Sequence, residues 1–143
     1  QIHTYEYKGY ARCLDSTAAY FKYSLEMLDI DISSRVFKSN WPIYTNTNDT
    51  PPTKYLENAK VKKSFVANGT VIDGTIENSI IGREVIIGKG AVIKNCVIFS
   101  GSKIAPNAVL ENVIIDKRAK VEKKLELKGT ENNPLYIKEG DRV

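Results

Sequence analysis

The sequence contains three consecutive rows of 17 residues: NSIIGREVIIGKGAVIK (78–94), NCVIFSGSKIAPNAVLE (95–111) and NVIIDKRAKVEKKLELK (112–128). Each row begins with asparagine, and within each row a large aliphatic residue recurs at intervals of five or six positions. The residue two places before each aliphatic site is small or β-branched, except Leu125. The aliphatic sites are Ile81, Ile87, Ile93, Ile98, Ile104, Leu110, Ile115, Val121 and Leu127.

This spacing fits neither a helix, which needs apolar residues about every 3.6 positions, nor a long strand, which needs strict alternation. Two residues that are two places apart point the same way, and glycine or asparagine then allows a turn. Three short strands per row therefore predict one triangular coil of a parallel β-helix, with the large residue inside. The alternative, a β-sandwich of short strands, would not keep a 17-residue register.

The coil pattern extends beyond the three rows in both directions. Ser64-Phe65-Val66 precedes the matching Ser79-Ile80-Ile81 by 15 residues, so the first coil is two residues short. About four coils are predicted between Val66 and Leu127. After a turn at 129–133, residues 135–137 are predicted to form a last strand that covers the end of the coil, because an open end exposes unpaired backbone groups.

The residues before the coils predict a different structure. Residues 2–10 alternate as a strand does, and Asp15-Ser16-Thr17 is a helix-start signal. Residues 31–39 are interpreted as transitional, and the stretch around Trp41 as an ordered loop. The helix stripe consists of Ala18, Phe21, Leu25 and Leu28.

The predicted fold is therefore mainly β: a β-helix preceded by a short strand, one α-helix and an ordered connector. The expected boundaries are 1–40 for the strand and helix, 41–60 for the connector, and 61–143 for the β-helix.

One outward face of the predicted β-helix is apolar along its whole length, and it consists of Phe65, Ile80, Val97 and Ile114. A continuous apolar ladder of this kind predicts a cover. The cover is either a part of this chain, namely the helix at 16–30 or the Trp41 loop, or another subunit. We prefer the cover within the chain, and keep all four residues as interface or packing candidates.

The net charge of +4 on 143 residues is spread along the chain, with a basic cluster between 117 and 128. A solvated corner of the coil is the preferred interpretation of this cluster. The alternative is a site for a phosphorylated effector, with the adjacent Lys117 and Arg118 as candidates. No aromatic residues are interleaved with these lysines, so we expect no nucleic-acid binding.

Two cysteines do not form a disulfide framework, and they favour a reducing, cytoplasmic setting. Cys96 occupies an inward position and is expected to be a buried thiol. No apolar run is long enough to span a membrane, and no signal peptide is visible. The chain begins at Gln1 without methionine, so we expect it to be a fragment.

Residues that could perform catalysis are scarce. His3 is the only histidine, and it lies outside the coils. No glycine-rich loop precedes a helix, and no residues have the spacing of metal ligands. We therefore assign no catalytic, cofactor-binding or metal-binding residue, and interpret the chain alone as a structural, oligomerising or regulatory module.

The order of several motifs resembles one family, bacterial glucose-1-phosphate adenylyltransferase (ADP-glucose pyrophosphorylase), and most closely its GlgD-type glycogen biosynthesis subunit. The resemblance covers nearly the whole chain, and the repeated coils are only one of the motifs that carry it. The motifs are YEYKGY (5–10), YARCLDS (10–16), WPIYT (41–45), PPTK (51–54) and the coils that begin with Asn-Ser-Ile-Ile.

This resemblance implies a left-handed coil at the C-terminal end of the family's nucleotidyltransferase domain, whose tail would form residues 1–40. It implies a role in subunit assembly and allosteric communication. The implied partner is a catalytic adenylyltransferase subunit in a hetero-oligomer, further copies of the same chain, or both. A phosphorylated sugar is the implied effector. The reaction of ATP with glucose 1-phosphate, with Mg²⁺, would belong to the catalytic partner only.

The chain departs from the pattern of catalytic members, which read Tyr-Trp-x-Asp-Ile-Gly-Thr near the start of this segment. Here Ala11, Cys13 and Asp15 occupy the Trp, Asp and Gly positions. A thiol does not replace a hard carboxylate oxygen as a ligand for Mg²⁺. We therefore expect a regulatory subunit that is inactive alone.

The alternative function is a stand-alone hexapeptide-repeat acyltransferase. Such enzymes resemble this chain in their coils and use a histidine of the coil as general base. The coils of this chain contain no histidine.

Overall fold

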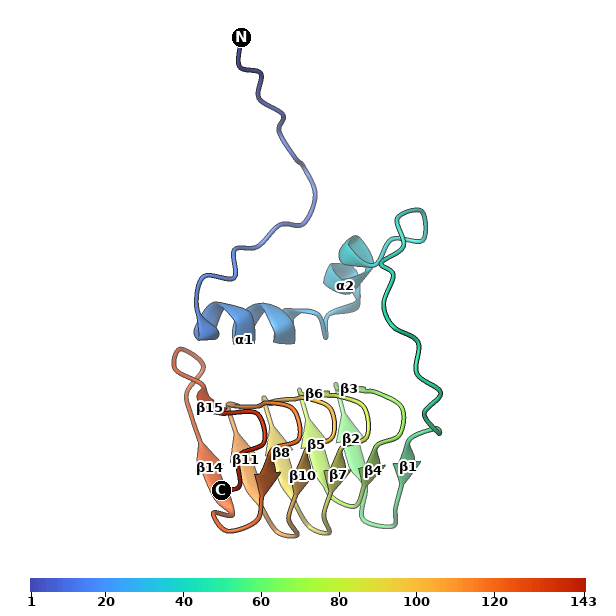
Figure 1. Ribbon diagram of the computed structural model, residues 1–143, viewed down its shortest axis with the longest axis vertical. Helices are drawn as coiled ribbons and strands as arrows, with labels where there is room; N and C mark the ends of the chain where they lie inside the picture. The colour runs from blue at the N-terminus through green and yellow to red at the C-terminus, as the bar shows by residue number, and fades with distance from the viewer.

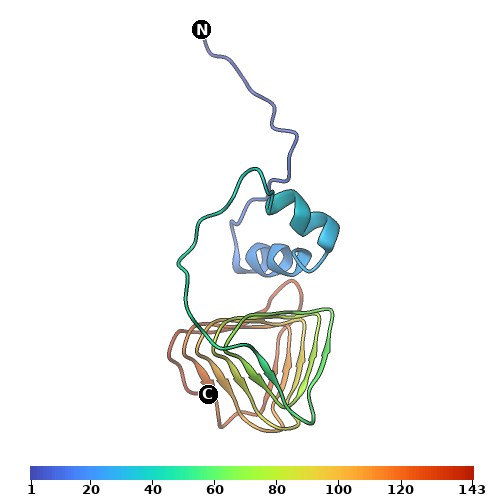
Figure 2. The ribbon, with the colours of Figure 1, turned by 90° about the vertical axis from the view of Figure 1, so that its right-hand side faces the viewer.

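Three parallel sheets form the sides of a triangular prism in the computed structural model, which describes residues 1–143 (Figures 1 and 2). Each sheet has five short strands, and successive strands of the chain pass from one sheet to the next. The predicted parallel β-helix is thereby confirmed.

The strands have the following bounds. Sheet A contains β1 (Lys54–Tyr55), β4 (Val71–Ile72), β7 (Ile86–Ile87), β10 (Lys103–Ile104) and β13 (Lys120–Val121). Sheet B contains β2 (Lys60–Lys62), β5 (Thr75–Glu77), β8 (Val92–Lys94), β11 (Val109–Glu111) and β14 (Glu126–Lys128). Sheet C contains β3 (Phe65–Val66), β6 (Ile80–Ile81), β9 (Val97–Ile98), β12 (Val113–Ile115) and β15 (Leu135–Ile137).

The register of the sheets reproduces the sequence repeat. Ile81 pairs with Ile98, and Ile98 with Ile115, each 17 residues further along the chain. Val66 pairs with Ile81 at the predicted shorter spacing of 15. The structure adds one earlier strand, because β1 pairs with β4. The β-helix therefore begins at Lys54, inside the segment 41–60 that we interpreted as connector.

The interior of the prism is a single apolar cluster of 18 buried residues. All nine predicted aliphatic sites belong to it, with exposed fractions of 2% or less. The residues two places before them are also buried, except Leu125, which is 40% exposed. Leu125 is also the only residue at these positions that is neither small nor β-branched, so the exception in the sequence pattern is the exception in burial.

The chain has two helices rather than the one we predicted; α1 (Thr17–Glu26) lies over sheet C, and α2 (Ile30–Val36) lies beyond α1, further from the prism (Figure 2). Helix α1 begins after Ser16, whose hydroxyl accepts a hydrogen bond from the Ala19 amide at 3.1 Å. Helix α2 occupies most of the segment that we interpreted as transitional. The Asp29 side chain caps α2 by accepting hydrogen bonds from two backbone amides. Neither helix is long and apolar enough to cross a membrane.

The strand predicted at residues 2–10 is absent, and this prediction was wrong. Residues 1–15 form no helix or strand and run away from the prism (Figure 1). A strand needs a neighbour for its backbone hydrogen bonds, and none of the fifteen strands pairs with this segment. By contrast, the strand predicted at residues 135–137 is present as β15 and pairs with β12.

A ladder of asparagine side chains stabilises one corner of the prism. Asn78, Asn95 and Asn112 have φ values of 47°, 48° and 55°, in the left-handed region that asparagine tolerates. The Asn78 amide donates to the Asn95 side-chain oxygen at 2.7 Å, and the Asn95 amide donates to that of Asn112 at 3.4 Å. The Asn112 amide then donates to the carbonyl oxygen of Gly129 at 3.2 Å.

Replacing Asn95 by alanine is expected to lower the free energy of unfolding by about 2–3 kcal/mol, because it removes two ladder hydrogen bonds and strains the left-handed backbone. Replacing it by glycine should cost about 1 kcal/mol less, since glycine tolerates this φ. Urea unfolding of both variants measures the difference. Equal losses for alanine and glycine would contradict the proposed backbone contribution.

Candidate functional site

The apolar ladder on the outer face of sheet C is continuous in the structure. Phe65 pairs with Ile80, Ile80 with Val97, and Val97 with Ile114. Val97 and Ile114 are buried, with exposed fractions of 4% and 2%, whereas Ile80 is half-buried and Phe65 is 43% exposed. The ladder is therefore covered at its β9–β12 end and open at its β3 end.

Helix α1 provides this cover. The side chain of Phe21, which is 2% exposed, packs with Val97 and Ile114 in a second apolar cluster. The ring of Tyr20 stacks on that of Phe99, with centroids 6.3 Å apart and planes inclined by 15°. Burial of a phenylalanine contributes roughly 2–3 kcal/mol, so α1 is attached mainly by this contact. The helix stripe predicted from the sequence thus packs on the predicted ladder.

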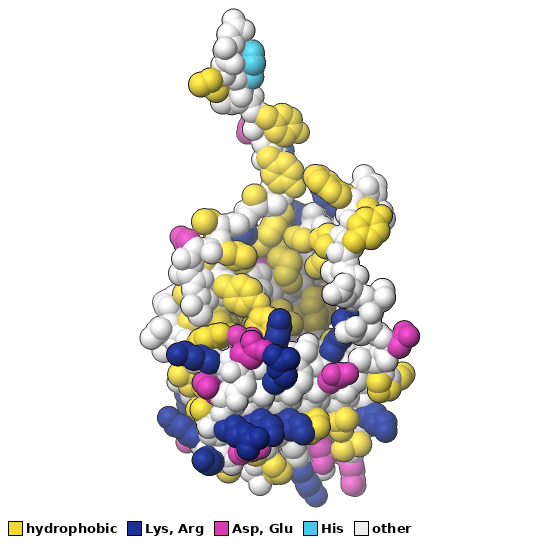
Figure 3. All heavy atoms as spheres, in the orientation of Figure 1, with side chains coloured by type: hydrophobic (Ala, Val, Ile, Leu, Met, Phe, Trp, Pro, Cys, Tyr) yellow, Lys and Arg dark blue, Asp and Glu magenta, His cyan; other side chains and the backbone are white.

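On the side of the helices away from the prism, four segments form an open apolar groove of about 450 Å³. Figure 3 shows hydrophobic side chains gathered in this hollow above the β-helix. The lining comes from the N-terminal segment, both helices and the connector, and includes Tyr7, Tyr10, Tyr23, Met27, Trp41 and Ile43. Trp41 is 70% exposed, so this loop does not cover the ladder.

One polar group anchors the N-terminal segment beside the groove. Glu26 of α1 accepts hydrogen bonds from the Tyr10 hydroxyl at 2.9 Å and from the Arg12 guanidinium at 3.3 Å. Burial, together with the hydrogen bond to Glu26, raises the pKa of Tyr10 above its usual value. The Arg12 guanidinium also lies over the ring of Tyr10, 4.4 Å from its centroid. These contacts fix the position of Tyr10 and Arg12 in the wall of the groove. Cys13, the next residue in the chain, is exposed.

The two effector candidates have different surroundings. The Arg118 guanidinium is paired with the Glu139 carboxylate, so its charge is already partly balanced. Lys117 is exposed, and its backbone amide donates to Asp116 at 2.7 Å. The Tyr136 hydroxyl also donates to Asp116, and these hydrogen bonds hold the pKa of that carboxyl below its usual value. The corner is an organised hydrogen-bond network with one free cation, that of Lys117.

The two cysteines differ sharply in environment. Burial raises the pKa of the Cys96 thiol to about 12. Its sulfur lies 3.0 Å from the Lys94 carbonyl oxygen, and its amide donates to the Ser79 hydroxyl at 2.9 Å. Cys96 is thus a packing residue in the coil wall, as its inward position predicted.

We expect iodoacetamide at pH 8 to alkylate Cys13 in the native protein and to leave Cys96 unmodified, because the thiolate is the reacting species. In urea both thiols should react. Mass spectrometry of the peptides measures this, and the Cys13→Ser variant provides the control, with no label expected under native conditions. Labelling of Cys96 at a rate similar to that of Cys13 would contradict its burial.

No group of three or more His, Cys, Asp or Glu side chains is placed to hold a metal ion. His3 is exposed in the N-terminal segment, far along the extended part of the chain (cyan in Figure 3). The acyltransferase alternative needs a histidine of the coil as general base, and His3 lies outside the coils.

Comparison with known proteins agrees with this architecture. Residues 51–133 match the family described as GlmU-like, C-terminal hexapeptide. The glycogen biosynthesis protein GlgD of Bacillus subtilis is 43% identical over 136 residues, which are 95% of this chain and 40% of that protein. GlgD of Geobacillus stearothermophilus is 53% identical over 70 residues, or 49% of this chain and 20% of that protein.

A glucose-1-phosphate adenylyltransferase of Corynebacterium jeikeium is 31% identical over 116 residues, or 80% of this chain and 29% of that protein. The chain therefore spans less than half the length of these relatives. The resemblance stated from the motifs is borne out, and the hexapeptide repeat fits a left-handed β-helix.

The sequence identified the ladder but not the groove. The groove residues come from four separate segments, two of which were expected to form other structures. The signal that was available is the density of aromatic residues before residue 45, which is high for segments with so little regular structure.

Proposed function

Because the chain belongs to the GlmU-like C-terminal hexapeptide family, we propose that it is the β-helix part of a regulatory, non-catalytic subunit in ADP-glucose synthesis for glycogen. The subunit would act in the cytoplasm, as a partner of a catalytic glucose-1-phosphate adenylyltransferase. Its β-helix would serve assembly and allosteric communication.

The observation that carries this proposal is the extent of the similarity to GlgD. Hexapeptide coils alone would account for similarity within residues 51–133, the range of the family match. The similarity to the Bacillus subtilis protein covers 136 residues, so it includes the two helices and most of the N-terminal segment. The elements that form the groove are therefore shared with a glycogen biosynthesis protein, and so is the prism.

Cys13 supports the non-catalytic part of the proposal. It occupies the position at which the resemblance places an aspartate in catalytic members, and it is exposed, between Arg12 and Leu14, which line the groove. A thiol does not supply the hard oxygen ligand that Mg²⁺ prefers. ATP and Mg²⁺ would accordingly be used by the catalytic partner.

The groove is the surface at which we place the contact with the nucleotidyltransferase part of the assembly. Its aromatic lining and the exposure of Trp41 are typical of a protein–protein contact, in which Trp and Tyr contribute most of the binding energy. The relatives are more than twice as long as this chain, so most of each relative lies outside the matched region.

An effector with a phosphoryl group would bind at Lys117 and Arg118, where the phosphoryl oxygens would compete with Glu139 for the guanidinium. Isothermal titration with fructose bisphosphate tests this site. Heat that is lost in the Lys117→Gln variant supports it, and absence of heat at millimolar ligand removes it.

The decisive experiment measures ADP-glucose formation by a catalytic adenylyltransferase, by the protein that carries this chain, and by the two mixed together. We expect no turnover by this protein alone and a several-fold increase in the mixture. Trp41→Ala should abolish the increase, whereas Tyr44→Ala, at an aromatic residue that is 91% exposed and outside the groove, should preserve it. Turnover by this protein alone, or no effect on the partner, would overturn the proposal.

A further inference from the structure

Two faces of the prism carry opposite arrangements of charged residues. Along one edge of sheet B the register places unlike charges next to each other on all five strands. This alternating ladder consists of Lys62, Glu77, Lys94, Glu111 and Lys128. Opposite charges in register stabilise a sheet, and like charges in register destabilise it. The face is therefore arranged for stability.

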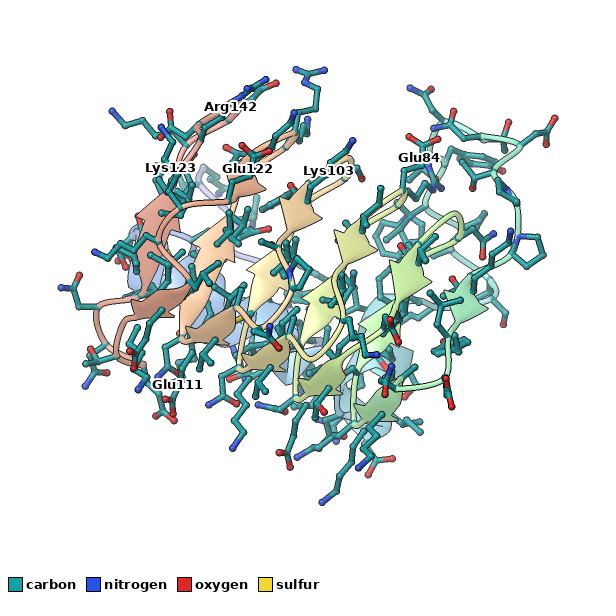
Figure 4. The ribbon with its side chains drawn as sticks, turned by 90° about the horizontal axis from the view of Figure 1, so that it is seen from below. Glu84, Lys103, Glu111, Glu122, Lys123 and Arg142 are labelled. Carbon is teal, nitrogen blue, oxygen red and sulfur yellow. The ribbon has the colours of Figure 1, made fainter.

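On the outer face of sheet A the arrangement is the reverse. Lys103 of β10 pairs in register with Lys120 of β13, and Lys120 forms a bridge with Arg142. Three cations thus occupy consecutive levels, which are about 4.8 Å apart. Figure 4 shows Lys103, Lys123 and Arg142 along one edge of the β-helix, with Glu122 and Glu84 on the same edge and Glu111 on the opposite edge. We call Lys103, Lys120, Lys123 and Arg142 the basic edge.

These cations form few close ion pairs within the chain, although Glu122 lies among them. Lys103, Lys123 and Arg142 form no ion pair, and Lys120 has one long contact, with its ammonium nitrogen 4.0 Å from a Glu122 oxygen. Backbone hydrogen bonds fix the last level in place, because the amide of Lys120 donates to the Asp141 carbonyl at 2.7 Å and that of Val143 to the Lys120 carbonyl at 3.0 Å. The backbone therefore holds these like charges close together, and their repulsion lowers the stability of the protein.

The shape of this surface decides which anion it fits. Small-molecule sites are concave, and the well-formed hollows of this molecule are lined by other residues. An exposed sheet face with cations on successive levels matches carboxylates repeated along a protein surface or segment. We propose that the basic edge is a docking surface for an acidic segment of a partner protein. The assignment depends on charge complementarity alone and is separate from the groove and its partner.

Fluorescence anisotropy with a labelled oligoglutamate peptide at low salt tests the docking surface. The variant Lys103→Gln/Arg142→Gln should bind about tenfold more weakly and with a smaller salt dependence. The matched control, Lys62→Gln/Lys94→Gln, removes the same charge from the alternating ladder and should bind as the native protein does. Equal losses of affinity in both variants would show that only the net charge matters and would overturn the proposal. Absence of peptide binding would overturn it as well.

Two further arms keep the proposal falsifiable. Inorganic phosphate and phosphatidylserine vesicles replace the peptide, and tighter, variant-sensitive binding of either would assign the edge to a small anion or a membrane and overturn the protein partner. In the free protein, Lys103→Glu creates an opposite-charge pair with Lys120 and should raise Tm by about 2 °C. A lower Tm would show that the cations stabilise the sheet and would contradict a binding role.

Discussion

Replacing Ile98 by alanine is expected to lower the free energy of unfolding by about 2–5 kcal/mol, because it leaves a cavity in a close-packed interior. Ile98 is 1% exposed and lies at the middle level of sheet C, between Ile81 and Ile115. Loss of its side chain weakens contacts with the levels on both sides. Urea unfolding followed by circular dichroism measures the change.

Ile86 is the matched control, since it is an isoleucine on a strand of the same prism but points outward and is 42% exposed. Ile86→Ala should cost well under 1 kcal/mol, and Ile98→Val about 0.5–1.5 kcal/mol. Similar losses for Ile86→Ala and Ile98→Ala would contradict the assignment of inward and outward positions.

Replacing Phe21 by alanine is expected to remove about 3–5 kcal/mol from the docking of α1 on sheet C. Phe21 is the most buried side chain of the helix and fills the contact with Val97 and Ile114. An isolated helix of this length is not stable in water, so α1 should unfold locally while the prism persists. Hydrogen exchange should then lose protection in residues 17–26 and keep it in the strands.

Phe37→Ala provides the comparison for Phe21→Ala, because Phe37 follows α2 and is 61% exposed. It should leave the protection of α1 unchanged. A native exchange pattern in Phe21→Ala would show that another contact holds the helix.

Removal of residues 1–40 tests whether the apolar ladder of sheet C needs a cover. If the remaining chain stays monomeric and soluble, no cover is needed and this inference is contradicted.

The regular part of the fold could be predicted because its interior repeats the same contact. Within the three rows, each inward aliphatic residue meets the equivalent residue 17 positions away, so the spacing in the sequence predicts the register of the strands. The start of the prism was harder to predict because β1 has Tyr55 at the inward site, at the open end and 58% exposed, where later levels have isoleucine or valine. An exposed tyrosine does not carry the pattern of a core residue.

The N-terminal part was predicted less well because its structure depends on partners distant in sequence. The alternation at residues 2–10 describes a strand, but no strand lies beside it to complete the hydrogen bonds. One helix was predicted before the connector, whereas the Asp29 side chain caps the start of a second helix. The same difficulty applies to the groove, whose four segments meet only in the folded chain.

The stacking of Ile81, Ile98 and Ile115 is the claim on which the rest depends, and nuclear Overhauser contacts between their methyl groups test it most directly. Neighbouring levels lie about 4.8 Å apart, so isoleucine-labelled protein should show contacts between Ile81 and Ile98 and between Ile98 and Ile115. Ile86, which points outward, should show none to these three. Absence of both stacked contacts, or methyl groups of Ile98 exposed to a solvent paramagnetic probe, would contradict the three-sided prism.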